Sequence, residues 1–274
     1  MSTHCRRHVE ELAAGRCRTC QHGYCVRCLV YAFGPSKPPY CVNCAIHAAG
    51  VRTRGMPARA LAVGAHPDDI EFGAGATLAR WAAAGCEVSL VVCTDGSKGT
   101  WDPTADLAAL VATRQDEARA AAAALGATGQ VVFLGAVDGE LENDRPTRSA
   151  LARWIRELRP DVLLGHDPWK RYRLHPDHRA AGFLTCDALV AARDPHFFPE
   201  QGIAHHRPSA LLLFEADEPD HTETAAPADV DAKIAALESH RSQYESTMFI
   251  SGAGDDEVAE EQERFRSEVR SGMT

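Results

Sequence analysis

The sequence contains no run of about 18 apolar residues, the length that an α-helix needs to cross a bilayer. The first residues, MSTHCRRHVE, also lack the apolar stretch that follows the charges of a signal peptide. We therefore expect a cytoplasmic protein with no membrane span. An excess of basic charge is missing too, because the net charge is -9, and this disfavours nonspecific nucleic-acid binding by the chain as a whole.

The sequence also lacks the motifs of a dinucleotide-binding protein and of a repeat protein. No GxGxxG motif follows the first predicted strand, and the pair Gly73 and Gly75 lies inside a predicted helix. No internal repeat or long low-complexity tract occurs beyond alanine-rich helices. The composition, with 45% hydrophobic and 24% charged residues, is typical of a globular protein.

Apolar strands and helical segments alternate regularly from residue 59 onward. We expect strands at 59–65, 87–94, 130–135, 162–165 and 210–215, and helices at 70–84, 107–125, 148–158, 177–192 and 229–244. Such alternation is typical of the α/β class, with a Rossmann-like, mostly parallel sheet flanked by helices.

We divide the chain into four segments. They are a small zinc-binding module at 1–50, a linker at 51–58, one α/β domain at 59–250 and a charged tail at 251–274. The tail could form an amphipathic helix with Val258, Phe265 and Val269 on one side, or it could be a loosely docked or disordered segment.

The motif AHPDD at 65–69 directly follows the first apolar strand, and HPDH at 175–178 follows a later one. His66, Asp69 and His178 form the set of three protein ligands that leaves a fourth zinc position open for water, as in catalytic zinc sites. The adjacent Asp68 and Asp69 should point in different directions, so one can bind metal while the other acts as general base. Ligands at strand ends lie where open α/β folds build their pockets.

Both motifs also have a simpler interpretation as helix caps. Asp68 or Asp69 could cap the helix that begins near Ile70, and His175 and His178 could be surface residues at the start of the next predicted helix. Two such motifs at the ends of two apolar strands favour the metal site over this alternative.

Seven of the ten cysteines lie in the first fifty residues, in pairs with the spacing of zinc ligands. Four pairs provide ligands for two tetrahedral structural sites. His22 or His47 could replace one of the ligands. The ligand pairs are Cys5 with His8, Cys17 with Cys20, Cys25 with Cys28, and Cys41 with Cys44.

A disulfide framework is the alternative for these cysteines, but reduced thiolates are expected in a cytoplasmic protein. Metal binding should provide most of the folding free energy of so small a module. A role in protein contact or self-association is favoured over nucleic-acid binding, although the module could also be a structural appendage. Cys86, Cys93 and Cys186 have no matching spacing and are expected to be buried.

Several motifs in order resemble the PIG-L or LmbE-like zinc de-N-acetylases, which remove acetyl groups from N-acetylglucosamine conjugates. The resemblance covers about residues 59–250. It rests on AHPDD, TDG at 94–96, Arg114 to Glu117, Asp138-Gly139, HPDH, and the late helix from Lys233 to Gln243 with its His240-Arg241-Ser242-Gln243 motif. The cysteine pairs resemble a B-box or RING-like module, which implies that the first and third pairs share one zinc and the second and fourth share another.

The family resemblance implies a role for each matching residue. His66, Asp69 and His178 would bind the catalytic zinc, and Asp68 would activate a water molecule there. His175 would stabilise the oxyanion as a charged imidazole, oriented by Asp177. The residues expected to contact the substrate are Asp95, Arg114, Asp138 and Arg173.

Arg173 is a departure from the pattern, because some sugar deacetylases of this family carry a tyrosine at that position. Tyr172 lies one residue further away. Arg173 could replace the tyrosine, bind an anionic part of the substrate, or belong to a solvated basic loop with Lys170 and Arg171.

Three functions follow from these observations. The first is a zinc-dependent amidohydrolase that removes an acetyl group from an N-acetylglucosamine-type conjugate. The second is an amidase that cleaves a thiol conjugate. The third is a non-enzymatic scaffold that senses a ligand and binds a partner through the zinc module. About three zinc ions per chain are expected, one catalytic and two structural, and iron could replace zinc at the catalytic site.

Overall fold

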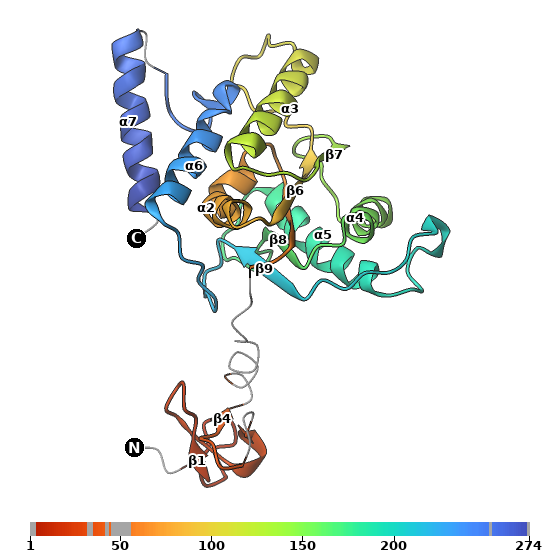
Figure 1. Ribbon diagram of the computed structural model, residues 1–274, viewed down its shortest axis with the longest axis vertical. Coiled ribbons are helices and arrows are strands. Elements are labelled where there is room, and N and C mark those ends of the chain that lie inside the picture. The colour runs from red at the N-terminus through yellow and green to blue at the C-terminus, as the bar shows by residue number, and fades with distance from the viewer. Residues whose placement is uncertain (1–3, 32–34, 42–43, 45–55, 252–253, 273–274) are drawn as a thin grey trace. The chain divides into compact units, whose positions relative to one another are not determined.

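The computed structural model describes residues 4–31, 35–41, 44, 56–251 and 254–272. The chain divides into two compact units, 1–55 and 56–274 (Figure 1). Residues 51–55 of the predicted linker at 51–58 lie outside the described residues, and so does His47.

The first unit is built from very short elements. β1 (Gly15–Arg16) pairs with β2 (Gly23–Tyr24), and β3 (Leu29–Val30) pairs with β4 (Tyr40–Cys41), both antiparallel. The 3-10 helix η1 (Val26–Cys28) connects β2 to β3. Its buried cluster consists of cysteines with Tyr24 and Tyr40, so the described residues of this unit form almost no aliphatic core.

The second unit contains a five-stranded parallel sheet with the order β7-β6-β5-β8-β9. The strands are β5 (Arg59–Gly64), β6 (Glu87–Thr94), β7 (Val131–Ala136), β8 (Val162–His166) and β9 (Ala210–Phe214). The central strands are buried on both faces, which explains their continuous apolar sequences. The predicted Rossmann-like α/β fold is confirmed.

Helices cover both faces of this sheet (Figure 1). On one face α4 (Arg145–Leu158) and α5 (Pro176–Arg193) pack against Leu61, Val63 and Leu163. On the other face α2 (Asp69–Ala83), α3 (Leu107–Ala124) and α6 (Pro227–Glu238) pack against Ala60, Ala62 and other small or apolar strand residues. Residues that alternate along one strand therefore contribute to two separate cores.

Two predicted helix boundaries differ from the structure by several residues. α4 begins at Arg145, three residues earlier than expected, because the Asp144 side chain caps the helix by accepting a hydrogen bond from the backbone N–H of Thr147 at 2.9 Å. The helix expected at 229–244 spans Pro227–Glu238 instead, and a separate 3-10 turn, η3 (Arg241–Gln243), follows it. This break places His240 and Gln243 in the protein interior.

The charged tail forms α7 (Asp255–Ser271), which docks on the second unit. Phe265 is buried against Leu237, Met248 and Ile250, with Val258 and Val269 beside them. The amphipathic helix is the form that the structure adopts, and the disordered alternative is wrong for the described residues. Among these residues, no helix combines the length and the apolar character that a membrane crossing requires.

Removing a buried side chain from α5 should destabilise the second unit strongly. Leu184 is fully buried between α4, α5 and the sheet, so Leu184→Ala is expected to lower the free energy of unfolding by about 2–5 kcal/mol. Val190 on the same helix is 40% exposed and provides the control, since Val190→Ala should cost much less. Urea denaturation followed by circular dichroism measures both. Equal losses would contradict this packing.

Candidate active site

The AHPDD motif lies at the carboxyl end of β5 and leads into α2. Asp68 is the N-cap residue of α2, but its side chain makes no capping hydrogen bond. Its φ of 116° lies in the left-handed region, which is unfavourable for a residue other than glycine. Strain of this kind concentrates at functional sites, and the capping interpretation of Asp68 is not supported.

Three ligand atoms from the two motifs converge on one point. His66 Nδ1 lies 3.2 Å from Asp69 Oδ2, His178 Nε2 lies 3.1 Å from Asp69 Oδ1, and the two histidine nitrogens are 3.2 Å apart. Ligands of a tetrahedral zinc ion, each about 2.0–2.2 Å from the metal, are separated by about 3.4 Å. This donor set therefore fits a divalent cation of that size.

The other ring nitrogen of His66 faces two carboxylates. His66 Nε2 lies 3.1 Å from Asp177 Oδ2 and 3.3 Å from Asp138 Oδ1. Burial lowers the pKa of His66, but hydrogen bonds with Asp138, Asp177 and Asp69 outweigh it and raise the pKa to about 12. The carboxylates thus favour positive charge at this imidazole, and they also fix the orientation of its ring.

Asp68 pairs with Arg114. The Arg114 Nη2 lies 3.5 Å from Asp68 Oδ2 and also donates a hydrogen bond to the Pro67 carbonyl at 2.7 Å. Burial raises the pKa of Asp68 to about 6, against the opposing effect of the Arg114 charge. The two adjacent aspartates therefore separate as expected, one toward the histidines and one toward a buried cation.

His175 differs from its expected state. Its Nδ1 accepts a hydrogen bond from the backbone N–H of Asp177 at 3.3 Å, so His175 caps α5. Its ring stacks on His178 with the ring centroids 4.8 Å apart. Burial and the neighbouring His66 and His178 lower the pKa of His175. The expectation of a charged imidazole held by the Asp177 carboxylate is corrected, because that carboxylate faces His66.

The residues expected to contact substrate are mostly turned into the protein. Arg114, Asp138 and Arg173 are 2%, 6% and 7% exposed. Asp138 Oδ2 accepts a hydrogen bond from the backbone N–H of Lys98, and Asp95 Oδ1 accepts one from that of Asp138, both at 3.1 Å. These side chains join the loops after the strands to one another. For Arg173, the solvated-loop alternative is wrong.

His166 was not predicted as a site residue, although it ends β8 at the carboxyl edge of the sheet. Its Nε2 lies 3.3 Å from Asp69 Oδ2, and its ring stacks on that of His178 with centroids 4.6 Å apart. The rule that strand ends carry functional side chains could have identified it. It belongs to a second possible metal-binding group with Asp69 and His178.

A buried pair beside Asp68 was also missed. His240 is fully buried, its Nε2 lies 3.8 Å from Glu71 Oε2, and its ring nitrogens have no hydrogen-bond partner among the described residues. The same motif supplies Gln243, which donates a hydrogen bond to the Gly99 carbonyl at 3.0 Å. The His240-to-Gln243 turn therefore packs against Glu71 of α2 and against the loop at Gly99.

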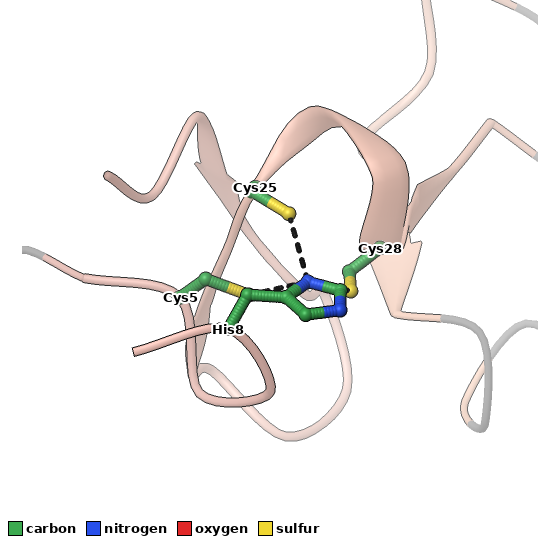
Figure 2. A group of neighbouring side chains, drawn as sticks. All are labelled: Cys5, His8, Cys25 and Cys28. Atoms are coloured by element: carbon green, nitrogen blue, oxygen red, sulfur yellow. Dashed lines mark hydrogen bonds between the residues drawn. The ribbon is translucent and has the colours of Figure 1, made fainter. Parts of the chain in front are cut away.

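The first unit gathers its paired ligands into two groups of four. Cys5, His8, Cys25 and Cys28 form one group, in which His8 Nδ1 lies 3.4 Å from the sulfurs of both Cys25 and Cys28 and 3.9 Å from that of Cys5 (Figure 2). Sulfur and nitrogen ligands of one zinc ion lie about 3.5 Å apart. The second group comprises Cys17, Cys20, Cys41 and Cys44.

This grouping joins the first pair to the third and the second pair to the fourth. All ten cysteines are free thiols, and His22 belongs to neither group. Burial raises the pKa of the Cys5 thiol, but hydrogen bonds from backbone groups, the Cys25 amide first, lower it to about 6. A thiol that ionises this readily is suited to metal binding.

Comparison with known proteins supports the family suggested by the motifs. Residues 61–189 match the family model of PIG-L, GlcNAc-PI de-N-acetylase. The chain is 32% identical over 189 residues to the diacetylchitobiose deacetylase of Thermococcus kodakarensis. This match covers 68% of this chain and 70% of that protein. A 1D-myo-inositol 2-acetamido-2-deoxy-alpha-D-glucopyranoside deacetylase from Frankia casuarinae is 34% identical, over 72% of this chain and 82% of its own length.

Other relatives match a smaller share of their length, since the chain spans 57% of the corresponding Streptomyces avermitilis deacetylase. Among solved structures, N,N'-diacetylchitobiose deacetylase from Pyrococcus horikoshii superposes with a TM-score of 0.68 and 29% identity, over 78% of this chain and 77% of that one. Sequence, fold and the convergence of AHPDD with HPDH agree, and the chain belongs to the PIG-L family of de-N-acetylases.

Proposed function

We propose that this chain is a metal-dependent amidohydrolase that removes the acetyl group from an N-acetylglucosamine-type conjugate. The observation that carries the proposal is the convergence of His66, Asp69 and His178 beside a second, separately held carboxylate. A ligand-sensing scaffold would need the three donor atoms but not the general base.

His66, Asp69 and His178 would hold the catalytic cation, for which we propose zinc. Two imidazoles and one carboxylate are the donor types that zinc takes in hydrolytic sites, and they do not exclude iron. When bound, the cation would polarise the acyl carbonyl and lower the pKa of a water molecule. Asp138 and Asp177 would keep the His66 ring oriented toward the cation.

Asp68 would remove the proton from the attacking water. Its carboxylate makes no capping hydrogen bond, and its Oδ2 lies 3.5 Å from Arg114 Nη2. Burial favours the protonated form after the transfer, so Asp68 could return its proton to the departing amine.

His175 would donate a hydrogen bond to the acyl oxygen as it becomes negative. Because His175 Nδ1 accepts from the Asp177 backbone, the proton of the neutral ring lies on Nε2. The ring borders His66 and His178 and is exposed on its outer side, where an acyl group can approach. A preorganised neutral donor of this kind stabilises an oxyanion without being charged.

The substrate class is proposed from the relatives. The relative from Thermococcus is named as a deacetylase of diacetylchitobiose, and the relative from Frankia as a deacetylase of a 2-acetamido-2-deoxyglucopyranoside of myo-inositol. The two cysteine-rich groups would hold structural zinc ions, which makes three cations per chain. We assign the module a role in protein contact or self-association.

Chelator treatment of the purified protein tests this function. Acetate release from N,N'-diacetylchitobiose and from a 2-acetamido-2-deoxyglucosyl inositol is expected to fall to background after treatment with 1,10-phenanthroline and to return with added Zn²⁺. The inactive enantiomeric sugar is the control for nonenzymatic hydrolysis. Release that persists in protein shown to be metal-free would refute the mechanism. Cleavage of a thiol-conjugate amide in place of both sugars would refute the substrate class alone.

A further inference from the structure

Three polar side chains form a chain that ends on the proposed metal ligand Asp69. His166 Nε2 lies 3.3 Å from Asp69 Oδ2, and His166 Nδ1 lies 3.2 Å from Arg173 Nη1. The same Arg173 nitrogen donates a hydrogen bond to Glu215 Oε2 at 2.7 Å. His166 ends β8 and Glu215 directly follows β9, so the chain of contacts joins the carboxyl ends of two neighbouring strands.

The contacts give each ring nitrogen of His166 its own partners. Nδ1 faces Arg173 and also lies 3.6 Å from Glu215 Oε2. Nε2 faces Asp69 Oδ2, and the backbone N–H of Ala65 lies beside it at 3.4 Å. One Nη1 group has two hydrogens, and it can therefore serve His166 and Glu215 together.

Two roles are open to His166. Asp69, His166 and His178 could together hold a cation, since their ligand atoms lie within 4.8 Å of one another. However, His66, Asp69 and His178 already supply three ligands, and a fourth protein ligand would close the position that a hydrolytic site keeps open for water. His166 is therefore assigned to the support of Asp69.

The backbone around these residues has unfavourable conformations. Tyr172, next to Arg173, has a φ of 57°, and Glu215 has a φ of 61°, both in the left-handed region. Non-glycine residues adopt this region mainly where surrounding contacts require it. Here the strained residues are those that bring Arg173 and Glu215 to His166.

We propose that His166 is a positioning residue for Asp69, and that Arg173 and Glu215 hold its ring in the required orientation. The inference rests on the proposed function, because it takes Asp69 as a ligand of the catalytic cation. It assigns Arg173 to the support of the metal site and removes it from substrate binding.

Zinc affinity of the full-length protein provides the main test. The thiolate groups should retain their zinc, so competition with a chromophoric chelator reports the exchangeable ion. His166→Gln is expected to weaken binding of that ion about 10–100-fold, the usual effect of losing a partner of a metal ligand. Glu215→Gln should weaken it roughly tenfold, at the lower end of that range. Glu218→Gln is the matched control. Glu218 lines the same surface cavity as Glu215, three residues further along the chain, and this variant should bind zinc like the wild type.

The double variant separates this role from a general loss of stability. Because Glu215 acts through His166, the His166→Gln/Glu215→Gln double variant should lose no more zinc affinity than His166→Gln alone. At saturating zinc, kcat should fall while KM for the acetylated sugar stays constant, since none of these residues touches substrate. Arg173→Lys keeps the charge but loses the planar fork, so it should restore only part of the affinity that Arg173→Met loses.

Each other outcome overturns the proposal in a recognisable way. Wild-type affinity in His166→Gln and Glu215→Gln, or a lowered melting temperature with unchanged affinity, would contradict the positioning role and leave the proposed function intact. Loss of one imidazole from the cation in X-ray absorption spectra of His166→Gln would make His166 a ligand. A wild type with no exchangeable cation would refute the proposed function and this inference together.

Discussion

Replacement of Asp68 with asparagine is expected to lower kcat for acetate release by about 10²–10⁴-fold, which is the usual contribution of a general base. Asparagine has nearly the same shape but cannot accept the proton of the attacking water. The metal content should stay unchanged, because Asp68 faces Arg114 and not the three ligand atoms. Steady-state acetate release and elemental analysis of the same preparation measure both quantities.

An exposed aspartate provides the control for this substitution. The Asp116 side chain on α3 is 81% exposed and pairs only with Arg119 at the surface, so Asp116→Asn should have wild-type kcat. Full activity in Asp68→Asn with its metal bound would remove Asp68 from the mechanism. Loss of the metal together with activity would mean that Asp68 is a ligand.

The second large effect is expected in the cysteine-rich unit. Cys25→Ser removes one of four ligands from the group in Figure 2, and this unit has almost no aliphatic core to compensate. In zinc-finger peptides, metal binding provides about 10–16 kcal/mol of folding free energy near pH 7. The variant should therefore become sensitive to protease throughout residues 4–44 and bind one zinc ion fewer.

Residues 56–274 should remain folded in this variant, because they form a separate unit with its own cores. Limited proteolysis followed by mass spectrometry distinguishes the two units. Cys186→Ser on α5 is the control, since Cys186 belongs to neither cysteine-rich group. Protease resistance of Cys25→Ser equal to that of the control would contradict a structural metal site.

The sheet could be predicted from the sequence because its central strands β5, β6 and β8 are buried on both faces and therefore contain continuous apolar runs. The prediction for Glu87–Thr94 agrees with the structure at both ends. The helix expected at 229–244 was too long, since its sequence continues in a helical pattern past Glu238. The turn at His240 depends on contacts with Glu71 and Gly99, which lie far away in the chain.

The proposed metal ligands could be identified from the sequence because AHPDD directly follows β5, HPDH lies at the start of α5, and both motifs have residue types that bind metal. The contacts of the side chains around these ligands could not be predicted from the sequence. Whether Arg114 or Asp138 faces substrate or protein depends on the loop that approaches it, and Pro67 and Lys98 supply those partners. His166 was missed because a single histidine at a strand end has no motif around it.

The central position of β5 has a consequence for biosynthesis. One edge of β5 pairs with β6, which follows soon after it in the chain. The other edge pairs with β8, where Ala60 lies opposite Val162. A nascent chain on the ribosome therefore exposes an unpaired apolar edge until about a hundred further residues have been translated, and such edges promote aggregation. His178 emerges later still, so the newly made protein acquires the full set of ligands proposed for the catalytic cation only after the sheet has closed around β5.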